Sequence, residues 1–398
     1  NGEDFCQQAV KNGASAVMVS EAVEVDVPQL ICENTLDALE ALAKAWLRQC
    51  DVKVVAVTGS NGKTTVKNML QAVLSESHQC FATPGNWNNE VGVPLSLLQL
   101  NPDDDFAVIE MGAAQIGDIA HLTSLVKPDV AIVNNVSNAH VGRFGSVENI
   151  AIGKGEIYEA LTENGVAIIN GDDIFKRMWQ MSIPSQQITF GMSESSDVRL
   201  LEATAVTKVE VPGGHVLSIK LPVLGRHNQM NAAAVIAVAV SLAIEEVDMI
   251  EGLESFEPAK GRMECAGSVN NTLIIDDSYN ANLASAKAAI DVLEKMKSPS
   301  VLVMGDMAEL GEFATQMHQE VGEYAEEKGI DTVLAVGEYA AAVCNNRKTN
   351  CITFSDVDAV INAIKSDHLV GGTVLVKGSR SMKLERVVDA LVQHEVTV

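Results

Sequence analysis

Residues 54–65, VVAVTGSNGKTT, have the composition of a phosphate-binding loop. A buried strand is predicted over residues 54–57, a turn with two glycines follows, and a helix is predicted from Lys63 or Thr64. This arrangement directs backbone N–H groups and a helix N-terminus at one point, which favours an anion. The spacing Thr-Gly-x-x-Gly-Lys-Thr is shorter than the standard loop, and the alternative is a strand–turn–helix junction with chance glycines. The candidate phosphate ligands are Thr58, Gly59, Ser60, Asn61, Gly62, Lys63, Thr64 and Thr65.

Glu110 is the further side chain whose type and position suit a metal ion. Glu110 follows a predicted strand, residues 106–109, at the carboxyl end where parallel sheets bind ligands. Together with the Thr64 hydroxyl, its carboxylate could bind Mg²⁺, although a solvated loop carboxylate is the alternative. His140 lies several residues beyond the predicted strand 130–133. Taken alone, His140 fits a surface or core histidine, and Lys154 fits a solvated helix lysine.

The elements that must position these residues follow an α/β rhythm. Short runs rich in Val, Ile and Leu alternate with amphipathic helical patterns, as in residues 64–74, where apolar side chains recur on one face. Alternating apolar residues between 198 and 224 predict an antiparallel β excursion. The rhythm predicts doubly wound α/β domains. The predicted strands are residues 54–57, 106–109, 130–133, 166–169, 272–275, 301–304, 332–336 and 373–376.

Length, composition and charge narrow the function classes. The chain has 398 residues, which suggests two or three domains, and 47% hydrophobic residues indicate a globular protein. The 28 basic and 53 acidic residues give a net charge of −25, which argues against nucleic acid or an anionic membrane as partner. A small anionic ligand stays possible, because a local nest of N–H groups can outweigh the overall field.

The cysteines and the apolar segments indicate a cytoplasmic protein. The seven cysteines are scattered without a CxxC pair, which favours reduced core thiols over a disulfide framework or a zinc site. No secretory signal is visible near residue 1, and the chain opens without Met. The longest apolar run, residues 232–244, is too short to span a bilayer and predicts a buried helix.

Several motifs in order resemble one family, the Mur ligases, which build the peptide of peptidoglycan. The resemblance runs from about residue 1 to 398. Its last three motifs most resemble the family members that add D-alanyl-D-alanine, and the Asp-Asn-Pro-Arg motif of the diaminopimelate-adding members is absent. The matching segments are residues 58–65, 83–94, 109–112, 134–140, 154–158, 225–231, 276–282, 304–311 and 377–380.

The resemblance implies a multidomain α/β fold in three parts. Residues 1–50 resemble the last part of an N-terminal α/β domain that binds the UDP-linked substrate, so the front of that domain is expected to be missing. Residues 51–260 are expected to form a central ATP-binding domain of the P-loop type with a parallel sheet. Residues 261–398 are expected to form a Rossmann-like C-terminal ligase domain.

The resemblance also implies a reaction and its partners. ATP would phosphorylate the terminal carboxylate of a UDP-N-acetylmuramoyl-tripeptide, and the amine of D-alanyl-D-alanine would attack the acyl phosphate. Such a transfer depends on positioning and charge neutralisation more than on covalent protein chemistry. The chain is then expected to be a cytoplasmic monomer of peptidoglycan precursor synthesis.

Residue roles follow from the same resemblance. The implied catalytic residues are Lys63, His140 and Lys154, with Lys154 carbamylated. Two Mg²⁺ ions would be held by Thr64, Glu110, His140 and the Lys154 carbamate. ATP would also contact Asn228, Asn231, Arg262 and Asp276, with Asp277 as an alternative to the last. Substrate contacts are implied for Asn88, Asn89 and Arg380.

Alternatives remain at this stage. Asn228 could simply cap a helix, and Arg380 could form a surface salt bridge. The whole chain could be another amino-acid-adding Mur ligase or a folylpolyglutamate-type ligase. A regulatory P-loop ATPase would leave His140 and the C-terminal motifs without a role. The intact Gly-Lys-Thr loop argues against a nonenzymatic module for uridine nucleotides.

Overall fold

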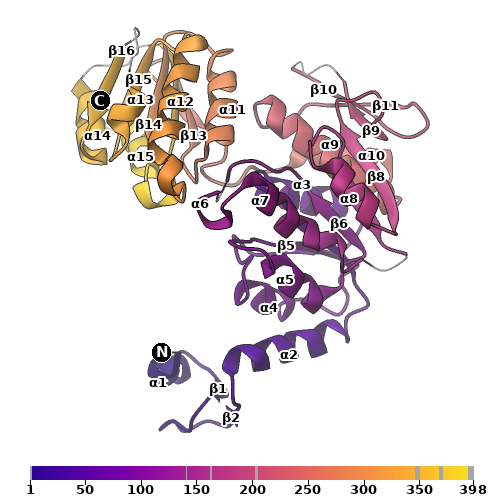
Figure 1. Cartoon of the computed structure of the whole chain (residues 1–398). Helices are drawn as coiled ribbons and strands as arrows, with labels where there is room; N and C mark the ends of the chain where they lie inside the picture. Colours follow the sequence, from indigo (N-terminus) through magenta and orange to yellow (C-terminus); the bar gives the residue numbers. More distant parts are fainter. Residues whose placement is uncertain are drawn as a thin grey trace.

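The computed structural model describes residues 2–139, 141–161, 164–201, 205–345, 350–366 and 371–392. Within these ranges the strands form three sheets, of two, nine and six strands. Figure 1 shows the nine-stranded and six-stranded sheets as separate layered bodies, with the N-terminal segment projecting below the larger one. The multidomain α/β fold is therefore confirmed, and two of its sheets are mainly parallel.

The N-terminal segment has a small core of its own. Its two strands pair in parallel, and Val17 and Val19 of the first strand are buried together with Cys6. The long helix α2 then leads to the larger body, where the indole of Trp46 donates a hydrogen bond to Leu100 O at 3.0 Å. The elements are η1 (Gly2–Phe5), α1 (Cys6–Lys11), β1 (Val17–Val19), β2 (Gln29–Ile31) and α2 (Thr35–Leu47).

The nine-stranded sheet has the order β11-β10-β9-β8-β7-β6-β3-β5-β4. Its strands run parallel from β4 to β9, and β10 and β11 continue antiparallel, as predicted for residues 198–224. Two strands of this sheet were not predicted from the sequence, because β8 begins with polar residues and the edge strand β4 is only three residues long. The strands are β3 (Lys53–Thr58), β4 (Cys80–Ala82), β5 (Phe106–Glu110), β6 (Val130–Val133), β7 (Val166–Asn170), β8 (Gln186–Gly191), β9 (Val198–Leu200), β10 (Thr207–Glu210) and β11 (Val216–Ile219).

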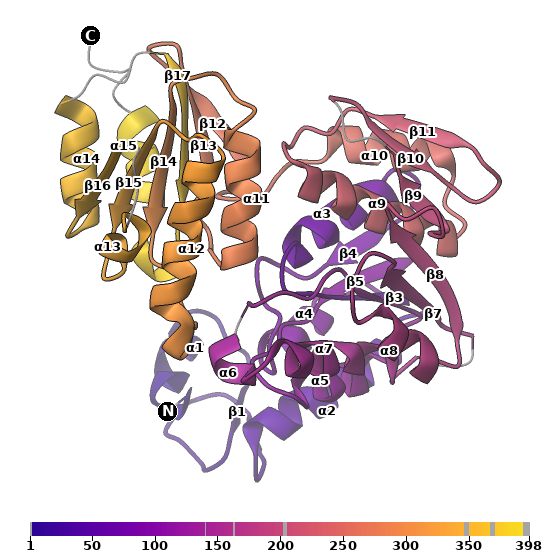
Figure 2. The ribbon, with the colours of Figure 1, turned by 45° about the horizontal axis from the view of Figure 1, so that its top comes forward.

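Helices cover both faces of this sheet, as Figures 1 and 2 show. Val55 and Val57 of β3 face one core, formed with α3, α9 and α10, whereas Val54 and Ala56 face the other. This alternation follows from the two-residue period of a strand. The helices are α3 (Lys63–Ser75), α4 (Gly92–Leu97), α5 (Asp118–Val126), α6 (Val141–Phe144), α7 (Val147–Gly155), η2 (Glu156–Tyr158), α8 (Lys176–Ser182), α9 (Arg226–Ser241) and α10 (Glu246–Ser255).

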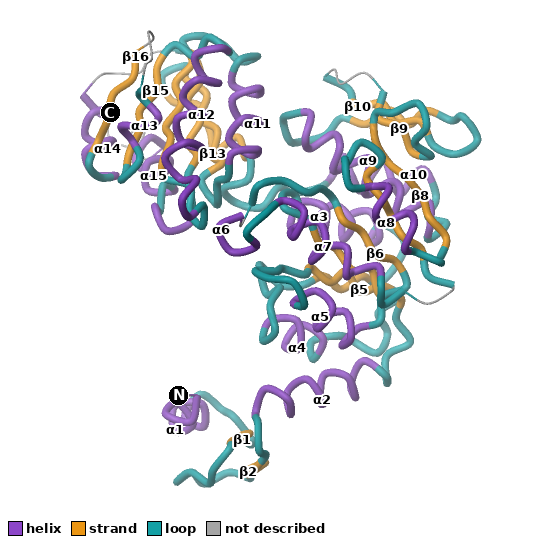
Figure 3. The backbone as a smooth tube through the Cα atoms, viewed as in Figure 1, coloured by secondary structure: helices purple, strands orange, loops and turns teal. Residues whose placement is uncertain are grey.

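The six-stranded sheet has the order β12-β13-β17-β14-β15-β16, with only β12 antiparallel to its neighbour. Its helices also lie on both faces, as the secondary-structure colouring of Figure 3 makes clear. The strands are β12 (Glu264–Val269), β13 (Thr272–Asp277), β14 (Ser300–Gly305), β15 (Thr332–Val336), β16 (Asn350–Phe354) and β17 (Gly372–Lys377). The helices are α11 (Leu283–Leu293), η3 (Gly311–Phe313), α12 (Ala314–Glu327), α13 (Ala340–Val343), α14 (Val357–Ser366), η4 (Arg380–Met382) and α15 (Glu385–Val392).

The cysteines differ from the sequence prediction. Cys344 and Cys351 form a disulfide between the end of α13 and β16, so the prediction that all thiols are reduced is wrong for this pair. The fold brings the two together across a short connection that carries no recognisable spacing motif. Of the five free cysteines Cys6 is buried, Cys50 and Cys80 are partly buried against the two cores of the nine-stranded sheet, and Cys265 is exposed, so the core location holds only in part.

The apolar run at residues 232–244 lies mostly in α9, which packs against the nine-stranded sheet. Across the residues that the structure describes, no helix is both long enough and apolar enough to cross a membrane.

Candidate active site

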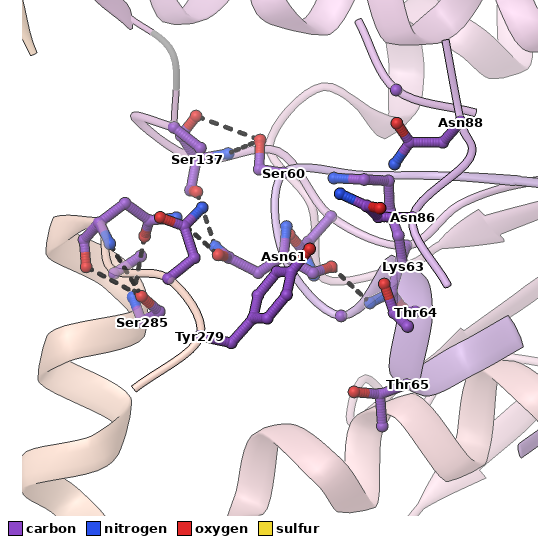
Figure 4. A pocket seen from close by; sticks show the side chains of 18 of the residues that line it. Ser60, Asn61, Lys63, Thr64, Thr65, Asn86, Asn88, Ser137, Tyr279 and Ser285 are labelled. Atoms are coloured by element: carbon purple, nitrogen blue, oxygen red, sulfur yellow. Dashed lines mark hydrogen bonds between the residues drawn. The ribbon is translucent and has the colours of Figure 1, made fainter. Parts of the chain in front are cut away.

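A cavity of about 1120 Å³ lies where the carboxyl ends of the central strands face the C-terminal sheet. Both bodies contribute side chains to its wall, and Figure 4 shows the loop after β3 directly opposite α11. The predicted residues that line it are Ser60, Asn61, Gly62, Lys63, Thr64, Thr65, Asn88, Asn89, Glu110, Asn228, Asn231, Arg262 and Arg380. Thr58, Gly59, Lys154 and Asp276 are outside this lining, and His140 lies outside the described residues.

The loop after β3 has the predicted strand–turn–helix form. Gly62 has a φ of 80° and immediately precedes α3, whose first turn receives no side-chain cap. The uncapped N–H groups of a helix start form an anion site. Two loop N–H groups are already used, because those of Ser60 and Asn61 donate to the backbone and side chain of Asn135.

Side-chain amides pack tightly against Gly62. A Cβ at this position would lie 2.5 Å from Asn134 Nδ2 and 2.6 Å from Asn231 Oδ1, so only glycine fits. Asn134 donates to Asn231 at 2.8 Å, Asn231 donates to Asn228, and Asn228 donates to Leu224 O. The two asparagines of α9 that were predicted near ATP therefore also support the phosphate loop.

Lys63 provides a cation at the start of α3. Its Nζ donates a hydrogen bond to Gly59 O at 2.8 Å, so the side chain folds back over its own loop. Burial lowers the pKa of Lys63, while the nearby Glu110 carboxylate raises it and Arg262 lowers it. An incoming phosphate would compete with the Gly59 carbonyl for this ammonium group, which favours anion binding at the same point.

Glu110 is 1% exposed at the end of β5. Its Oε1 accepts a hydrogen bond from Asn88 Nδ2 at 2.7 Å, whereas its buried Oε2 has no hydrogen-bond partner among the described residues. An unpartnered carboxylate oxygen in a polar cavity is a suitable ligand for a hard cation. Asn88, predicted as a substrate contact, here orients Glu110, and Asn89 accepts from Gly92 N at the start of α4.

The described residues contain no group of three or more His, Cys, Asp or Glu side chains that could hold a metal ion. A Mg²⁺ site at Glu110 would therefore need other oxygens, such as hydroxyl, phosphate or carbamate. Thr64 Oγ1 lies in the same cavity and accepts a hydrogen bond from Arg262 Nη2 at 3.0 Å. The donor set thus fits Mg²⁺ once Thr64 exchanges this partner.

Lys154 is 1% exposed in α7, which is unlike the solvated helix lysine that the sequence alone suggests. Burial lowers its pKa well below the usual value, and the positive charge of Lys63 lowers it further. No carboxylate among the described residues forms an ion pair with it. Lys154 therefore favours the neutral amine, which is the nucleophilic form of a lysine.

The C-terminal body contributes a second set of polar groups. Arg262 lies 4.2 Å above the Tyr279 ring, and Arg380 pairs with Glu385 at 3.0 Å while its side chain stays largely exposed. Asn282, which caps α11, donates to Asn61 Oδ1 at 2.6 Å and so joins this body to the phosphate loop.

Sequence reasoning missed two buried lysines beside the cavity. Lys67 donates to Thr83 O and Gly85 O, and the nearby Glu110 opposes the lowering of its pKa by burial. Lys377 pairs with Asp277 at 2.6 Å, and both line the cavity in place of Asp276. Lys67 follows apolar Val66 in a helix, and nothing in the sequence around it indicates a functional lysine. Lys377 belongs to the motif of residues 377–380, from which only Arg380 was predicted as a site residue.

Comparisons with known proteins match this arrangement. Residues 57–239 match the family profile described as Mur ligase middle domain, and residues 261–380 match Mur ligase, glutamate ligase domain. The Escherichia coli UDP-N-acetylmuramoyl-tripeptide–D-alanyl-D-alanine ligase is 41% identical over 99% of this chain and 89% of its own length.

Two solved structures have the same architecture. MurF from Acinetobacter baumannii superposes with a TM-score of 0.91 at 34% identity, covering 98% of this chain and 88% of that one. The MurF ligase from Thermotoga maritima in complex with ADP gives a TM-score of 0.87 at 30% identity, covering 98% and 91%.

Proposed function

The chain belongs to the Mur ligase family, and from that membership we propose that it joins D-alanyl-D-alanine to UDP-N-acetylmuramoyl-tripeptide at the expense of ATP. It is an ATP-dependent ligase, and the proposal identifies the peptide and the amine that it joins. Similarity to E. coli and A. baumannii ligases of this specificity supports the choice. Folylpolyglutamate ligases, at 17% identity or below, share only the fold.

One observation carries the proposal: the phosphate loop and the C-terminal motifs line a single cavity. A regulatory ATPase has no need of Asn282, Arg262 and Tyr279 from a second sheet around its phosphate loop. A ligase does, because the activated carboxylate must meet the amine where water is excluded. The same observation supports roles for residues 51–260 and 261–398 as ATP and ligase segments, and residues 1–50 are proposed as the uridine-side segment from the family resemblance alone.

ATP would be held by the loop and by residues of both bodies. The uncapped N–H groups at the start of α3 and the Lys63 ammonium would bind the β- and γ-phosphates. Arg262 is within reach of the same phosphates from across the cavity, since it already donates to Thr64. Asn228, Asn231, Asp276 and Asp277 are the candidates for the nucleoside side.

Mg²⁺ would be held by Thr64 and Glu110, with a second ion near Lys154 and His140. When bound, such ions neutralise charge on the transferring phosphoryl group. The unpartnered Glu110 Oε2 supports the first site. For the second, the neutral Lys154 amine would add to CO2 from dissolved bicarbonate. An N–C bond forms as one C=O π bond of CO2 opens, one proton leaves, and the neutral amine becomes an anionic carbamate that would offer oxygen ligands. Burial and Lys63 support this, because both favour the neutral amine.

The peptide bond would form in two steps, phosphorylation of the tripeptide carboxylate and attack by the dipeptide amine. A tripeptide carboxylate oxygen attacks the γ-phosphorus, ADP leaves, and the dipeptide amine displaces phosphate from the acyl carbon. Asn89 and Arg380 line the cavity and are the candidates for peptide contacts, and Asn88 would act through Glu110. Arg380 could bind a carboxylate with two parallel hydrogen bonds.

Phosphate release with a panel of acceptors tests the specificity. With UDP-N-acetylmuramoyl-tripeptide and ATP present, D-alanyl-D-alanine should stimulate phosphate release at least ~100-fold over glutamate or diaminopimelate. A Lys63→Ala variant should lower that rate by about 10²-fold or more, because it removes a charge from the transferring phosphate. Release that needs no acceptor would favour the regulatory ATPase, and a preference for glutamate would favour another ligase.

A further inference from the structure

Glu156 is a buried acid whose carboxylate faces the beginning of another helix. It is 6% exposed in η2, directly after α7. Its Oε1 accepts a hydrogen bond from Gly117 N at 2.7 Å, and its Oε2 accepts one from Ala120 N at 3.0 Å. Both carboxylate oxygens are therefore occupied by N–H groups of the first turn of α5.

Helix α5 depends on this remote acid for its N-terminal cap. The residue before the helix is Gly117, which has a φ of 99° and no side chain to offer. Asp118 points the other way, because its Oδ2 accepts from Ala114 N and Gln115 N. Glu156 thus does for the third helical N–H group what an Asp or Ser side chain does at most helix starts.

The capped helix lies on the chain segment that carries Glu110. Glu110 ends β5, and the connection from Met111 to Gly117 leads directly into α5. Glu156 in turn lies two residues beyond Lys154 in the sequence. One carboxylate therefore ties the segment of the proposed metal ligand Glu110 to the segment of Lys154. Helices α5 and α7 lie side by side in Figures 1 and 2.

Close packing on both sides of Lys154 keeps this segment in place. A Cβ on Gly153 would lie 2.9 Å from the Phe144 ring and 3.5 Å from Ile116 Cα, and one on Gly155 would lie 2.6 Å from Trp179 Nε1. The Trp179 indole also donates to Ala151 O at 3.1 Å. Packing thus fixes the lateral position of α7, and the Glu156 hydrogen bonds fix it against α5.

We propose that Glu156 is a positioning residue that holds Lys154 in register with Glu110, so that a carbamate on Lys154 and the Glu110 carboxylate can serve one metal centre. This rests on the proposed function, which assigns the carbamate to Lys154. The packing of Gly153 against Ile116 sets the Lys154 segment against the connection that leads from Glu110 to α5. Glu156 itself touches neither substrate nor metal in this account.

The substitution Glu156→Gln separates positioning from folding. Glutamine has the same size but only one accepting oxygen, so its NH2 group would oppose one of the two helix N–H donors. One of the two hydrogen bonds to Gly117 N and Ala120 N is kept, and the other is replaced by a contact between two donors. The repulsion should shift η2 away from α5, while the side chain still fills its place in the packing. Asp172→Asn is the matched control. Asp172 also accepts two backbone N–H groups, from Met192 and Ser193, but it lies outside the cavity lining.

The test uses the full chain in ¹³C-bicarbonate and measures three quantities: the carbamate signal by ¹³C NMR, the bicarbonate concentration for half-maximal activity, and the melting temperature. Lys154→Arg assigns the signal. We expect Glu156→Gln to stay folded, to lose most of the signal at low bicarbonate, and to need at least ~5-fold more bicarbonate. Asp172→Asn should keep the signal and the bicarbonate requirement of the unmodified chain.

The outcomes separate this inference from the proposed function. A wild-type chain without a carbamate signal would refute the modification itself, and with it the role of Glu156. A wild-type signal that Glu156→Gln retains in full, with an unchanged bicarbonate requirement, would leave the proposed function standing and overturn the positioning role. A lower melting temperature with both other quantities unchanged would likewise make Glu156 a purely structural cap.

Discussion

At the residue scale, side-chain amides hold the short phosphate loop in shape. Asn135 takes up the N–H groups of Ser60 and Asn61, while Asn134 and Asn231 press against Gly62. The helix N-terminus is thereby left open toward the cavity, because the N–H groups that the loop retains begin at Gly62. Rigid placement of these donors matters more for phosphoryl transfer than their number, since the enzyme mainly positions charge.

Gly62→Ala should damage the loop more than its backbone angle alone explains. The new Cβ would meet Asn134 and Asn231 within 2.6 Å, and the φ of 80° is unfavourable for alanine. We expect a KM for ATP raised at least ~10-fold and a free energy of unfolding lowered by ~2 kcal/mol or more. Steady-state kinetics and urea unfolding measure both quantities.

Gly213→Ala is the control, because Gly213 also has a positive φ, 98°, but has open space around its missing Cβ. It should cost about 1 kcal/mol and leave the KM for ATP unchanged. Equal effects of the two substitutions would show that the contact with the asparagines is unimportant.

At the element scale, His318 fixes the loop that follows β14. The ring lies fully buried in α12, stacked 4.7 Å from Tyr339. Its Nδ1 donates to Ala314 O, and its Nε2 accepts from Met307 N at 2.8 Å, so both nitrogens are used by a neutral ring. Protonation would set an N–H group against the Met307 N–H, which is consistent with the burial that lowers the pKa of His318.

The pH dependence of stability should reveal this neutral histidine. Because the folded-state pKa of His318 lies below its unfolded value of about 6.5, the unfolded chain binds the extra proton first as pH falls. His318 should therefore stabilise fully above pH 6.5 and lose up to about 1.4 kcal/mol per pH unit below it. His318→Gln keeps an acceptor for Met307 without titrating, so the stability gap between wild type and variant should narrow from pH 7.5 to 5. A constant gap would contradict the assignment.

The sequence could predict the strands of the two large sheets because both sheets are covered on both faces. All eight predicted strands are present, and the apolar face of α3 is buried as expected. The edge strands β4, β12 and β16 were not predicted, since edge strands need no continuous apolar run, and the internal β8 was missed because its sequence begins with two glutamines. In the site, Glu110 and the loop followed from their strand ends. Three buried charged residues could not be predicted, namely Glu156, Lys67 and Lys377. Their partners lie 16 to 100 residues away in the sequence, so no local sequence pattern indicates these contacts.

At the scale of the whole molecule, an acidic chain gathers its cations at one cleft. The net charge is −25, yet Lys63, Lys67, Arg262, Lys377 and Arg380 all lie in or beside the cavity. Carboxylates such as Glu110 and Asp277 line the same cavity, so attraction for a polyphosphate depends on these cations together with the uncapped N–H groups of α3, while salt screens charges beyond about 10 Å. The two large bodies also contact each other beside this cleft.

One such contact allows no side chain on Gly142. Its N–H donates to Glu309 O at 3.2 Å, and a Cβ would lie 2.8 Å from that oxygen. Alanine is favoured over glycine inside a helix by about 1 kcal/mol, so Gly142→Ala should stabilise an isolated α6. In the whole chain we expect the opposite: a larger radius of gyration by X-ray scattering with an ATP analogue, and a kcat lowered about 10-fold.

Glu309→Ala tests the same contact from the other side, because it removes the ion pair with Arg143 at 2.6 Å but keeps the backbone. This variant should lose less activity than Gly142→Ala, since an exposed ion pair contributes little. Unchanged scattering and kcat in Gly142→Ala would show that closure does not depend on this contact.

Transfer of oxygen from the tripeptide to phosphate tests whether this chain forms the peptide bond through an acyl phosphate. The tripeptide substrate is labelled with ¹⁸O in its terminal carboxylate and incubated with the enzyme, ATP and D-alanyl-D-alanine. The masses of the peptide product and of the released phosphate are then measured by mass spectrometry. We expect a peptide product extended by the dipeptide and released phosphate that carries one ¹⁸O, because the attacking carboxylate oxygen leaves with the phosphate. Phosphate without the label, or labelled phosphate without an extended peptide, would contradict it.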